Sequence, residues 1–101
     1  MKEPKIPTYK ISYDMFSSGM TIEQIAKERG LVYGTVFGHI ARYVEAGELE
    51  MDRLVPEEHI KAIKTFIINN PNNRSVSDIY SGVGPVVTYN EIHLYLKMFG
   101  E

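Results

Sequence analysis

Hydrophobic residues recur at three- and four-residue spacing along most of the chain, and glycine, proline or asparagine separates the runs. This period is typical of amphipathic helices. The clearest run covers residues 20–44, where Thr21 and Gln24 have the spacing of a capping box at the start of a helix. Gly30 stands where that helix must end. The pattern predicts a second helix from Tyr33 to Ala46, directly after a sharp turn.

The predicted second helix has two chemically different faces. The face expected to be buried is apolar and carries Val36, Phe37, Ile40, Tyr43 and Val44. The opposite face carries Thr35, Gly38, His39 and Arg42. A helix-turn-helix places its second helix in the DNA major groove, where small and hydrogen-bonding side chains contact phosphates and base edges. We therefore predict these four as DNA-binding residues, while noting that any amphipathic helix has a solvated polar face.

Weaker signals surround this pair of helices. Residues 1–7 read as a linker or disordered leader, because they hold two prolines and three charged residues. Thr8 is predicted to cap a helix over residues 9–18, which completes a first three-helix unit over residues 8–55. We expect the buried stripe of this helix to contain Ile11, Met15 and Phe16. Three further cations are expected to contact DNA phosphates: Lys10, Lys27 and Arg29.

The rest of the chain predicts a second, degenerate unit over residues 56–101, packed on the first. Residues 48–54 alternate charged and apolar positions, which predicts a short strand without a partner. Pro56, Ser75 and the pair Thr88 and Glu91 mark three helix starts, the last helix ending near residue 99. The fold class is thus all-α, with tandem tri-helical helix-turn-helix units that are winged-helix-like with the wing reduced or absent. Similar hydrophobic spacing recurs in any helical protein, so the apparent repeat of two units can also arise without a true repeat.

The last predicted helix differs from a DNA reader. Its outward face combines polar residues with Leu94 and Met98. An apolar pair beside a polar stripe favours packing against another surface. We therefore predict Leu94 and Met98 as partner-binding residues.

The charge balance limits the kind of DNA binding that the chain supports. The net charge is −2, and residues 1–55 contain seven basic and eight acidic side chains. Non-specific affinity for DNA comes mainly from lysine and arginine. DNA binding should therefore be local, weak or assisted by a neighbouring domain.

Other classes of function find little support. His39, His59 and His93 lack metal-ligand spacing, and no nucleophile or base has an orienting partner. We expect no catalytic residue, metal site, cofactor or small-molecule ligand. The absence of cysteine, of a membrane-length apolar run and of a signal peptide indicates a cytoplasmic protein that does not bind membranes.

Two stretches resemble the helix-turn-helix domain at the extreme C-terminus of bacterial RecQ-type ATP-dependent DNA helicases. They are TIEQIAKERGLVYGTVFGHIARYVEAGELEMDRLVPEEHIKAI and TYNEIHLYL, and the similarity spans roughly residues 9–99. The core pattern IA-x-x-x-GL-x-x-x-TV is shared with many transcription regulators, whereas GHIARYVEAGE favours the helicase tail. The chain departs from the usual pattern at Val32, where a serine or similar residue normally caps the second helix.

The resemblance implies a non-catalytic accessory module of a DNA helicase, acting near the bacterial nucleoid. Its partners would be DNA and the remainder of the parent helicase, whose motor domains are absent from this sequence. Two alternatives stay open. One is a protein-docking module that uses Leu94, Met98 and the acidic residues 45–52. The other is a small dimeric transcription regulator, which the charge balance disfavours most.

Overall fold

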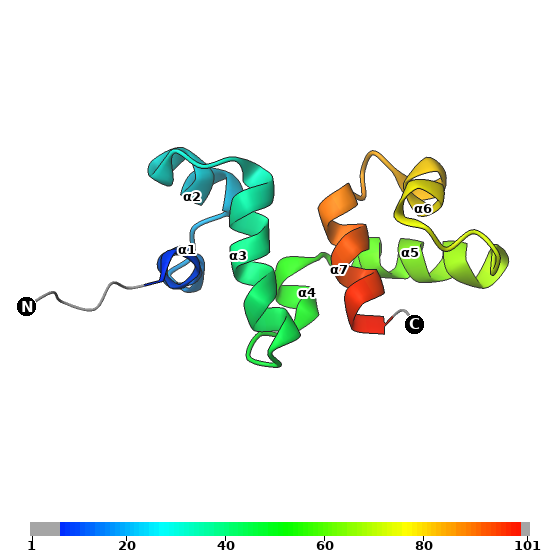
Figure 1. Ribbon diagram of the computed structural model, residues 1–101, viewed down its shortest axis with the longest axis horizontal. Coiled ribbons are helices and arrows are strands. Elements are labelled where there is room, and N and C mark those ends of the chain that lie inside the picture. Colours follow the sequence, from blue (N-terminus) through cyan, green and yellow to red (C-terminus); the bar gives the residue numbers. More distant parts are fainter. Residues whose placement is uncertain (1–6, 100–101) are drawn as a thin grey trace, which may run out of the picture. The chain divides into compact units, whose positions relative to one another are not determined.

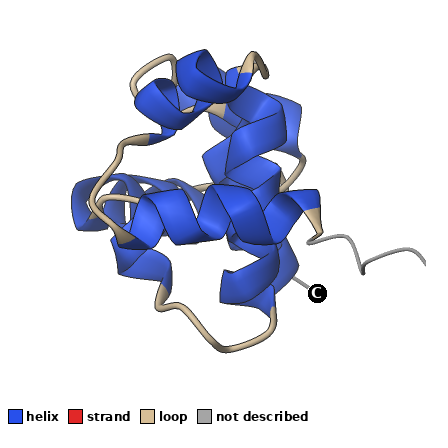
Figure 2. Ribbon diagram, turned by 90° about the vertical axis from the view of Figure 1, so that its left-hand side faces the viewer, coloured by secondary structure: helices blue, strands red, loops and turns tan. Residues whose placement is uncertain are grey.

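The computed structural model describes residues 7–99, and within them every regular element is a helix (Figures 1 and 2). The helices, in chain order, are α1 Thr8–Ser17, α2 Ile22–Arg29, α3 Tyr33–Glu45, α4 Met51–Leu54, α5 Glu57–Asn69, α6 Val76–Val83 and α7 Tyr89–Phe99. None of these helices combines the length and the apolar character needed to cross a membrane. The all-α prediction is confirmed.

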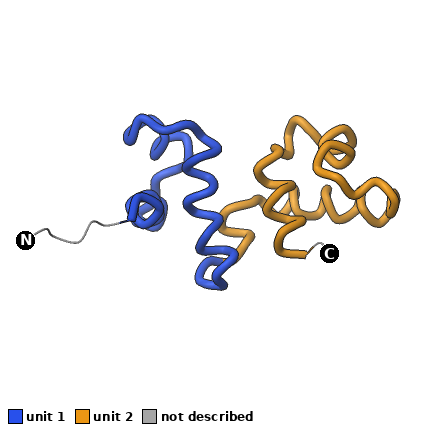
Figure 3. The backbone as a smooth tube through the Cα atoms, viewed as in Figure 1, with its two compact units in different colours: residues 1–49 blue, residues 50–101 orange. Residues whose placement is uncertain are grey.

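The chain divides into two compact units, residues 1–49 and 50–101 (Figure 3). In the first unit α1, α2 and α3 all contact one another, and in the second unit α5, α6 and α7 do the same. Residues 1–6 of the expected leader lie outside the described part of the chain. The division falls before α4, whereas the sequence suggested a boundary after residue 55. That the second unit packs on the first stays a prediction.

Local chemistry sets the turn between α2 and α3. The Thr21 hydroxyl accepts a hydrogen bond from the Gln24 N–H at 3.1 Å, and the Gln24 side chain accepts one from the Thr21 N–H at 2.9 Å. Gly30 ends α2 with a φ of 66°, a left-handed conformation that glycine adopts without a Cβ clash. The Leu31 N–H then bonds the Ala26 carbonyl at 2.9 Å. Residues 30–32 therefore form a short turn that joins the two packed helices, as a helix-turn-helix requires.

Two expectations for α1 are wrong. Pro7, not Thr8, is the N-terminal cap, and Thr8 lies inside the helix. The buried stripe also differs from the expected one, because Ile11 is 36% exposed and Met15 and Phe16 are only half-buried, while Ser12 has no exposed surface. A buried serine is stable only when its hydroxyl is hydrogen-bonded. The Ser12 hydroxyl is hydrogen-bonded to the Arg29 side chain of α2 and the His39 side chain of α3. These bonds hold this face of α1 toward the interior.

The strand expected over residues 48–54 is also wrong. The chain forms the short helix α4 there, in which the Val55 N–H bonds the Met51 carbonyl at 2.8 Å. No described segment forms a strand, so a strand here would have left its backbone groups without a ladder partner. In the observed structure the Arg53 N–H bonds the Glu50 carbonyl at 3.0 Å, and the N–H groups of Glu48 and Leu49 bond the Tyr43 carbonyl of α3 at 2.8 Å and 3.1 Å.

In the second unit, as in the first, side-chain caps mark helix starts and apolar side chains form a buried core. Ser75 caps α6 through the Asp78 N–H at 3.1 Å, and Thr88 forms a reciprocal capping box with Glu91. Its core is built by four buried side chains: Ile63, Ile79, Val87 and Ile92. The connection between α6 and α7, residues 84–88, is longer than the connection between α2 and α3. A helix-turn-helix in this unit would therefore have a longer turn than the one in the first unit.

Leu94 does not have the exposure that the sequence suggested. It is only 3% exposed, whereas Met98 is 36% exposed. The expected apolar pair on the outer face of α7 is therefore wrong in one of its two members. A buried side chain offers no docking surface, so Met98 alone keeps that candidate role.

Candidate nucleic-acid interface

The outer face of α3 is a polar stripe of small and cationic residues. Thr35, Gly38 and Arg42 are exposed along it, and Val36, Ile40 and Val44 are buried on the opposite side. Val32 stands at the N-cap without a side-chain hydrogen bond, and the first turn of α3 carries no acidic residue. The positive end of the helix dipole is therefore not offset there by a carboxylate, which favours the approach of an anion.

Gly38 lies in the middle of this stripe, although the fold does not need a glycine there. A Cβ built on Gly38 would meet no heavy atom within 4 Å, and its φ is that of an ordinary helical residue. Glycine inside a helix costs about 0.5–1 kcal/mol relative to alanine. The position thus lowers stability without a packing reason, which points to the close approach of an external surface.

Arg42 is held against α1 by an aromatic ring. Its guanidinium carbon lies 4.0 Å from the centre of the Tyr9 ring, which is cation–π distance. The Tyr13 and Tyr43 rings stack at 3.8 Å between centroids. Tyr13 therefore has an aromatic stacking partner within the first unit. These contacts fix the side of α3 that faces α1.

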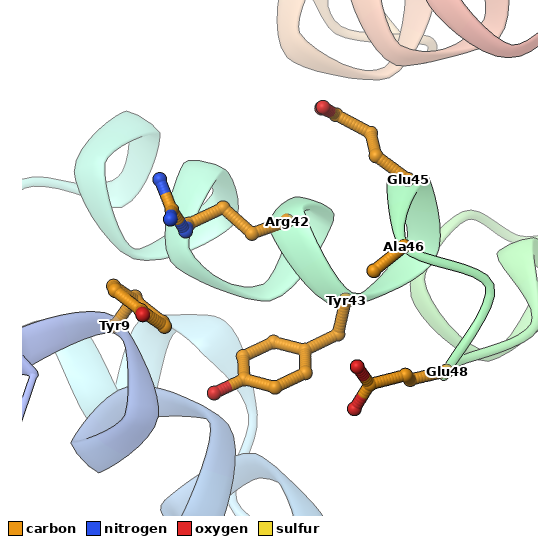
Figure 4. A pocket seen from close by; sticks show the side chains of 6 residues that line it. All are labelled: Tyr9, Arg42, Tyr43, Glu45, Ala46 and Glu48. Atoms are coloured by element: carbon orange, nitrogen blue, oxygen red, sulfur yellow. The ribbon is translucent and has the colours of Figure 1, made fainter.

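A shallow pocket of about 480 Å³ lies beside this cluster (Figure 4). Its lining comes from α1, the C-terminal end of α3 and the turn that follows it: Tyr9, Arg42, Tyr43, Glu45, Ala46 and Glu48. Burial, and after it the neighbouring Tyr9, raises the pKa of the Tyr43 phenol, so this ring stays neutral at pH 7. Glu45 and Glu48 place carboxylates at this end of the stripe. A phosphate therefore has a better environment near the N-terminal half of α3 than here.

His39 and Arg29 meet in a network centred on Ser12. The His39 Nδ1 lies 2.8 Å from the Ser12 hydroxyl oxygen, which also accepts a hydrogen bond from Arg29 at 2.8 Å. Arg29 further donates to the Thr8 carbonyl at 2.8 Å and to the Thr8 hydroxyl at 2.9 Å. Burial lowers the pKa of His39 below its ordinary value of 6.5, and the charges of Arg29 and Arg42 lower it further. His39 is therefore neutral at pH 7.

The seven expected DNA-binding residues occupy four environments. Thr35, Gly38 and Arg42 share the exposed stripe, while His39 and Arg29 share the Ser12 network. Lys10 on α1 pairs with Asp14 at 3.0 Å, and this exposed carboxylate raises the lysine pKa. Lys27 is exposed in the last turn of α2. Their DNA contacts stay predictions, and Arg29 is the least available of the seven because its donors already bond Thr8 and Ser12.

Sequence reasoning missed Ser12 and Tyr9 as residues of this site. Ser12 stands within the apolar stripe of α1, and a serine in such a stripe is a usable sign of a buried polar contact. Tyr9 carried no comparable signal, because its role depends on Arg42 from a distant part of the chain.

Three mutually packed helices, a tight glycine turn and an outward polar face on α3 define the first unit as a helix-turn-helix. A family model described as a helix-turn-helix domain matches residues 8–96, and the chain belongs to this family. No curated protein and no solved structure matches the chain.

Proposed function

We propose that this chain is a non-catalytic DNA-binding module whose helix α3 enters the major groove of duplex DNA. The observation that carries the proposal is Gly38, a glycine that lowers helix stability and leaves open space at the centre of an exposed polar stripe. A surface without a side chain lets the helix axis approach base edges and phosphates closely. Family membership supports the same class of function.

The charge distribution supports weak binding that a larger protein assists. On the exposed stripe of α3 Arg42 is the cation, with Lys27 exposed on α2, while Glu45 and Glu48 lie at the C-terminal end of α3. Each neutralised phosphate contributes about 0.9 to the slope of log K against log salt, so few contacts give a shallow slope. The resemblance of residues 38–48 to RecQ-type helicase tails supports a helicase as the parent protein. The module would then help the motor to hold its substrate.

Fluorescence anisotropy of the 101-residue chain with labelled duplex, forked and single-stranded DNA tests the proposal. Arg42→Ala should weaken binding to the duplex and lower the salt slope by about 0.9. Arg74→Ala is the matched control, because Arg74 is an exposed arginine outside α3 and should leave binding unchanged. Equal effects of the two variants, or no binding even at low salt, would refute DNA binding through α3.

The second unit favours a second candidate function, protein docking. Several of its large apolar side chains are exposed, namely Ile68, Val86, Tyr89, Met98 and Phe99. Exposed apolar side chains mark a surface that contacts another protein where they form a contiguous patch. Under this alternative Met98→Asp would abolish association with the parent protein, and Arg42→Ala would have no effect on it.

A further inference from the structure

The Ser12 hydroxyl has one hydrogen to donate, and it is buried so that only protein atoms contact it. The residue has no exposed surface, and every buried polar side-chain atom among residues 7–99 has a hydrogen-bond partner. Its neighbours in the network are the Arg29 guanidinium and the His39 ring. A guanidinium only donates hydrogen bonds, so the hydroxyl oxygen accepts from Arg29.

This leaves His39 Nδ1 as the acceptor for the hydroxyl hydrogen. If Nδ1 instead carried a proton and donated it, the buried hydroxyl hydrogen would lose the partner that the 2.8 Å contact provides. An unsatisfied buried donor is unfavourable. The chain of donors therefore runs from Arg29 to Ser12 and on to His39, and it requires a neutral ring whose proton is on Nε2.

The Nε2 atom reaches the solvent. The hydrogen bonds of His39 are made by Nδ1, and a buried ring nitrogen without a partner would contradict the complete satisfaction of buried polar atoms in this part of the chain. His39 is also adjacent on α3 to Gly38, the open position of the exposed stripe. The ring thus presents an N–H next to the surface proposed to meet DNA.

We propose that Arg29 and Ser12 are positioning residues that hold His39 as the neutral Nε2–H tautomer, and that this N–H donates a hydrogen bond to a DNA phosphate beside α3. Only the second part of this inference, the hydrogen bond to a DNA phosphate, rests on the proposed function. The charged groups that act on the ring are Arg29 from α2 and Arg42 from α3. Burial opposes a positive charge on His39, and the two arginines add to this effect.

The first arm of the test uses the chain without DNA. Nitrogen-15 spectra of the histidine rings at neutral pH should give His39 a protonated Nε2 and an unprotonated Nδ1, with exposed His93 on α7 as a comparison in the same spectrum. Ser12→Ala should shift His39 toward a mixture of tautomers. A protonated Nδ1, or a doubly protonated ring, in the unchanged protein would overturn the assignment whatever the variant does.

The second arm compares two amides at position 39 by DNA anisotropy. Glutamine places its N–H₂ near the position of Nε2, whereas asparagine reaches only as far as Nδ1. His39→Asn should weaken duplex binding about tenfold, the loss expected for one hydrogen bond to a charged group, and His39→Gln should retain most of the affinity. Because a neutral donor releases no counterion, the salt slope should stay unchanged in both variants.

The outcomes separate this inference from the proposed function. A slope that falls by about 0.9 in His39→Asn would mean that His39 binds as a cation, which overturns the inference. Full affinity of His39→Asn, together with weakened binding of Arg42→Ala, would overturn the phosphate contact while the proposed function stands. Absence of any DNA binding would refute the proposed function and the phosphate contact together, and the ring spectra would still decide the tautomer.

Discussion

Replacing Gly38 by alanine should make the protein more stable and a weaker DNA binder. Alanine removes the entropic penalty of a helical glycine, which is about 0.5–1 kcal/mol. The new methyl group meets no atom within 4 Å, so no steric cost offsets this gain. We therefore expect the free energy of unfolding to rise by about 0.5–1 kcal/mol. Urea titration followed by circular dichroism measures the change.

Gly82 provides the matched control within the same chain. It lies in α6, but a Cβ added there would clash with the Phe66 ring, which packs against the core of the second unit. Overpacking costs about 1–3 kcal/mol, which exceeds the helix gain. Gly82→Ala should therefore lower the free energy of unfolding. If Gly38→Ala also lowered it, the conclusion that this position is open in the fold would be wrong.

The DNA arm of this prediction uses the same protein. If α3 approaches the groove closely, the methyl group at position 38 should reduce duplex affinity, and Gly38→Gln should reduce it further, by about tenfold or more. A stabilised Gly38→Ala protein that binds duplex DNA as tightly as the parent would refute the close-approach reasoning. The opposite signs for stability and binding exclude simple misfolding as the cause of weaker binding.

Three further changes test other parts of the description. Val32→Ser should raise the free energy of unfolding by about 0.5–1 kcal/mol in urea titrations, because α3 lacks a side-chain cap; no gain would contradict that account. The pKa of His39 is lowered in the folded protein. The unfolded state therefore binds more protons than the folded state once the pH falls below 6.5, the ordinary pKa of histidine. Stability should therefore fall as the pH drops below that value, and His39→Gln should reduce this loss in urea titrations at neutral and acidic pH; an equal loss would exclude His39 as its source. Glu91→Ala should cost about 1–3 kcal/mol in the same assay, because this buried carboxylate bonds His59 at 3.0 Å and the Thr88 N–H at 2.9 Å. Glu91→Gln, which keeps an acceptor for Thr88, should lose less, and equal losses would contradict the capping role.

The helix ends that are marked by a capping box or by a left-handed glycine could be predicted, because they depend on residues close in sequence. The capping boxes at Thr21 and Thr88 and the left-handed Gly30 each involve atoms within a few positions. The sequence therefore contained all the chemistry that these features need. The expected strand over residues 48–54 failed because alternation predicts a strand only when another strand is available for pairing.

The candidate site was predictable only in part, because some of its contacts join residues that are far apart in sequence. The periodicity of α3 identified Thr35, Gly38 and Arg42 as outward residues, since it depends on one helix alone. The role of Ser12 depends on atoms from α1, α2 and α3 meeting at one point. No spacing rule within a single helix reports such a meeting.

The contact between Arg42 and Tyr9 has a consequence for the entropy of binding. A free arginine side chain has about 2 kcal/mol of rotamer entropy, part of which is lost when it binds a phosphate. Stacking on the Tyr9 ring at 4.0 Å restricts the face of the guanidinium before any ligand arrives. The N–H groups of a guanidinium lie in its plane, so a ring over its face leaves them suited to bind an anion. If Arg42 binds a phosphate as proposed, Tyr9 would contribute to affinity by ordering this cation in advance, without itself touching the ligand.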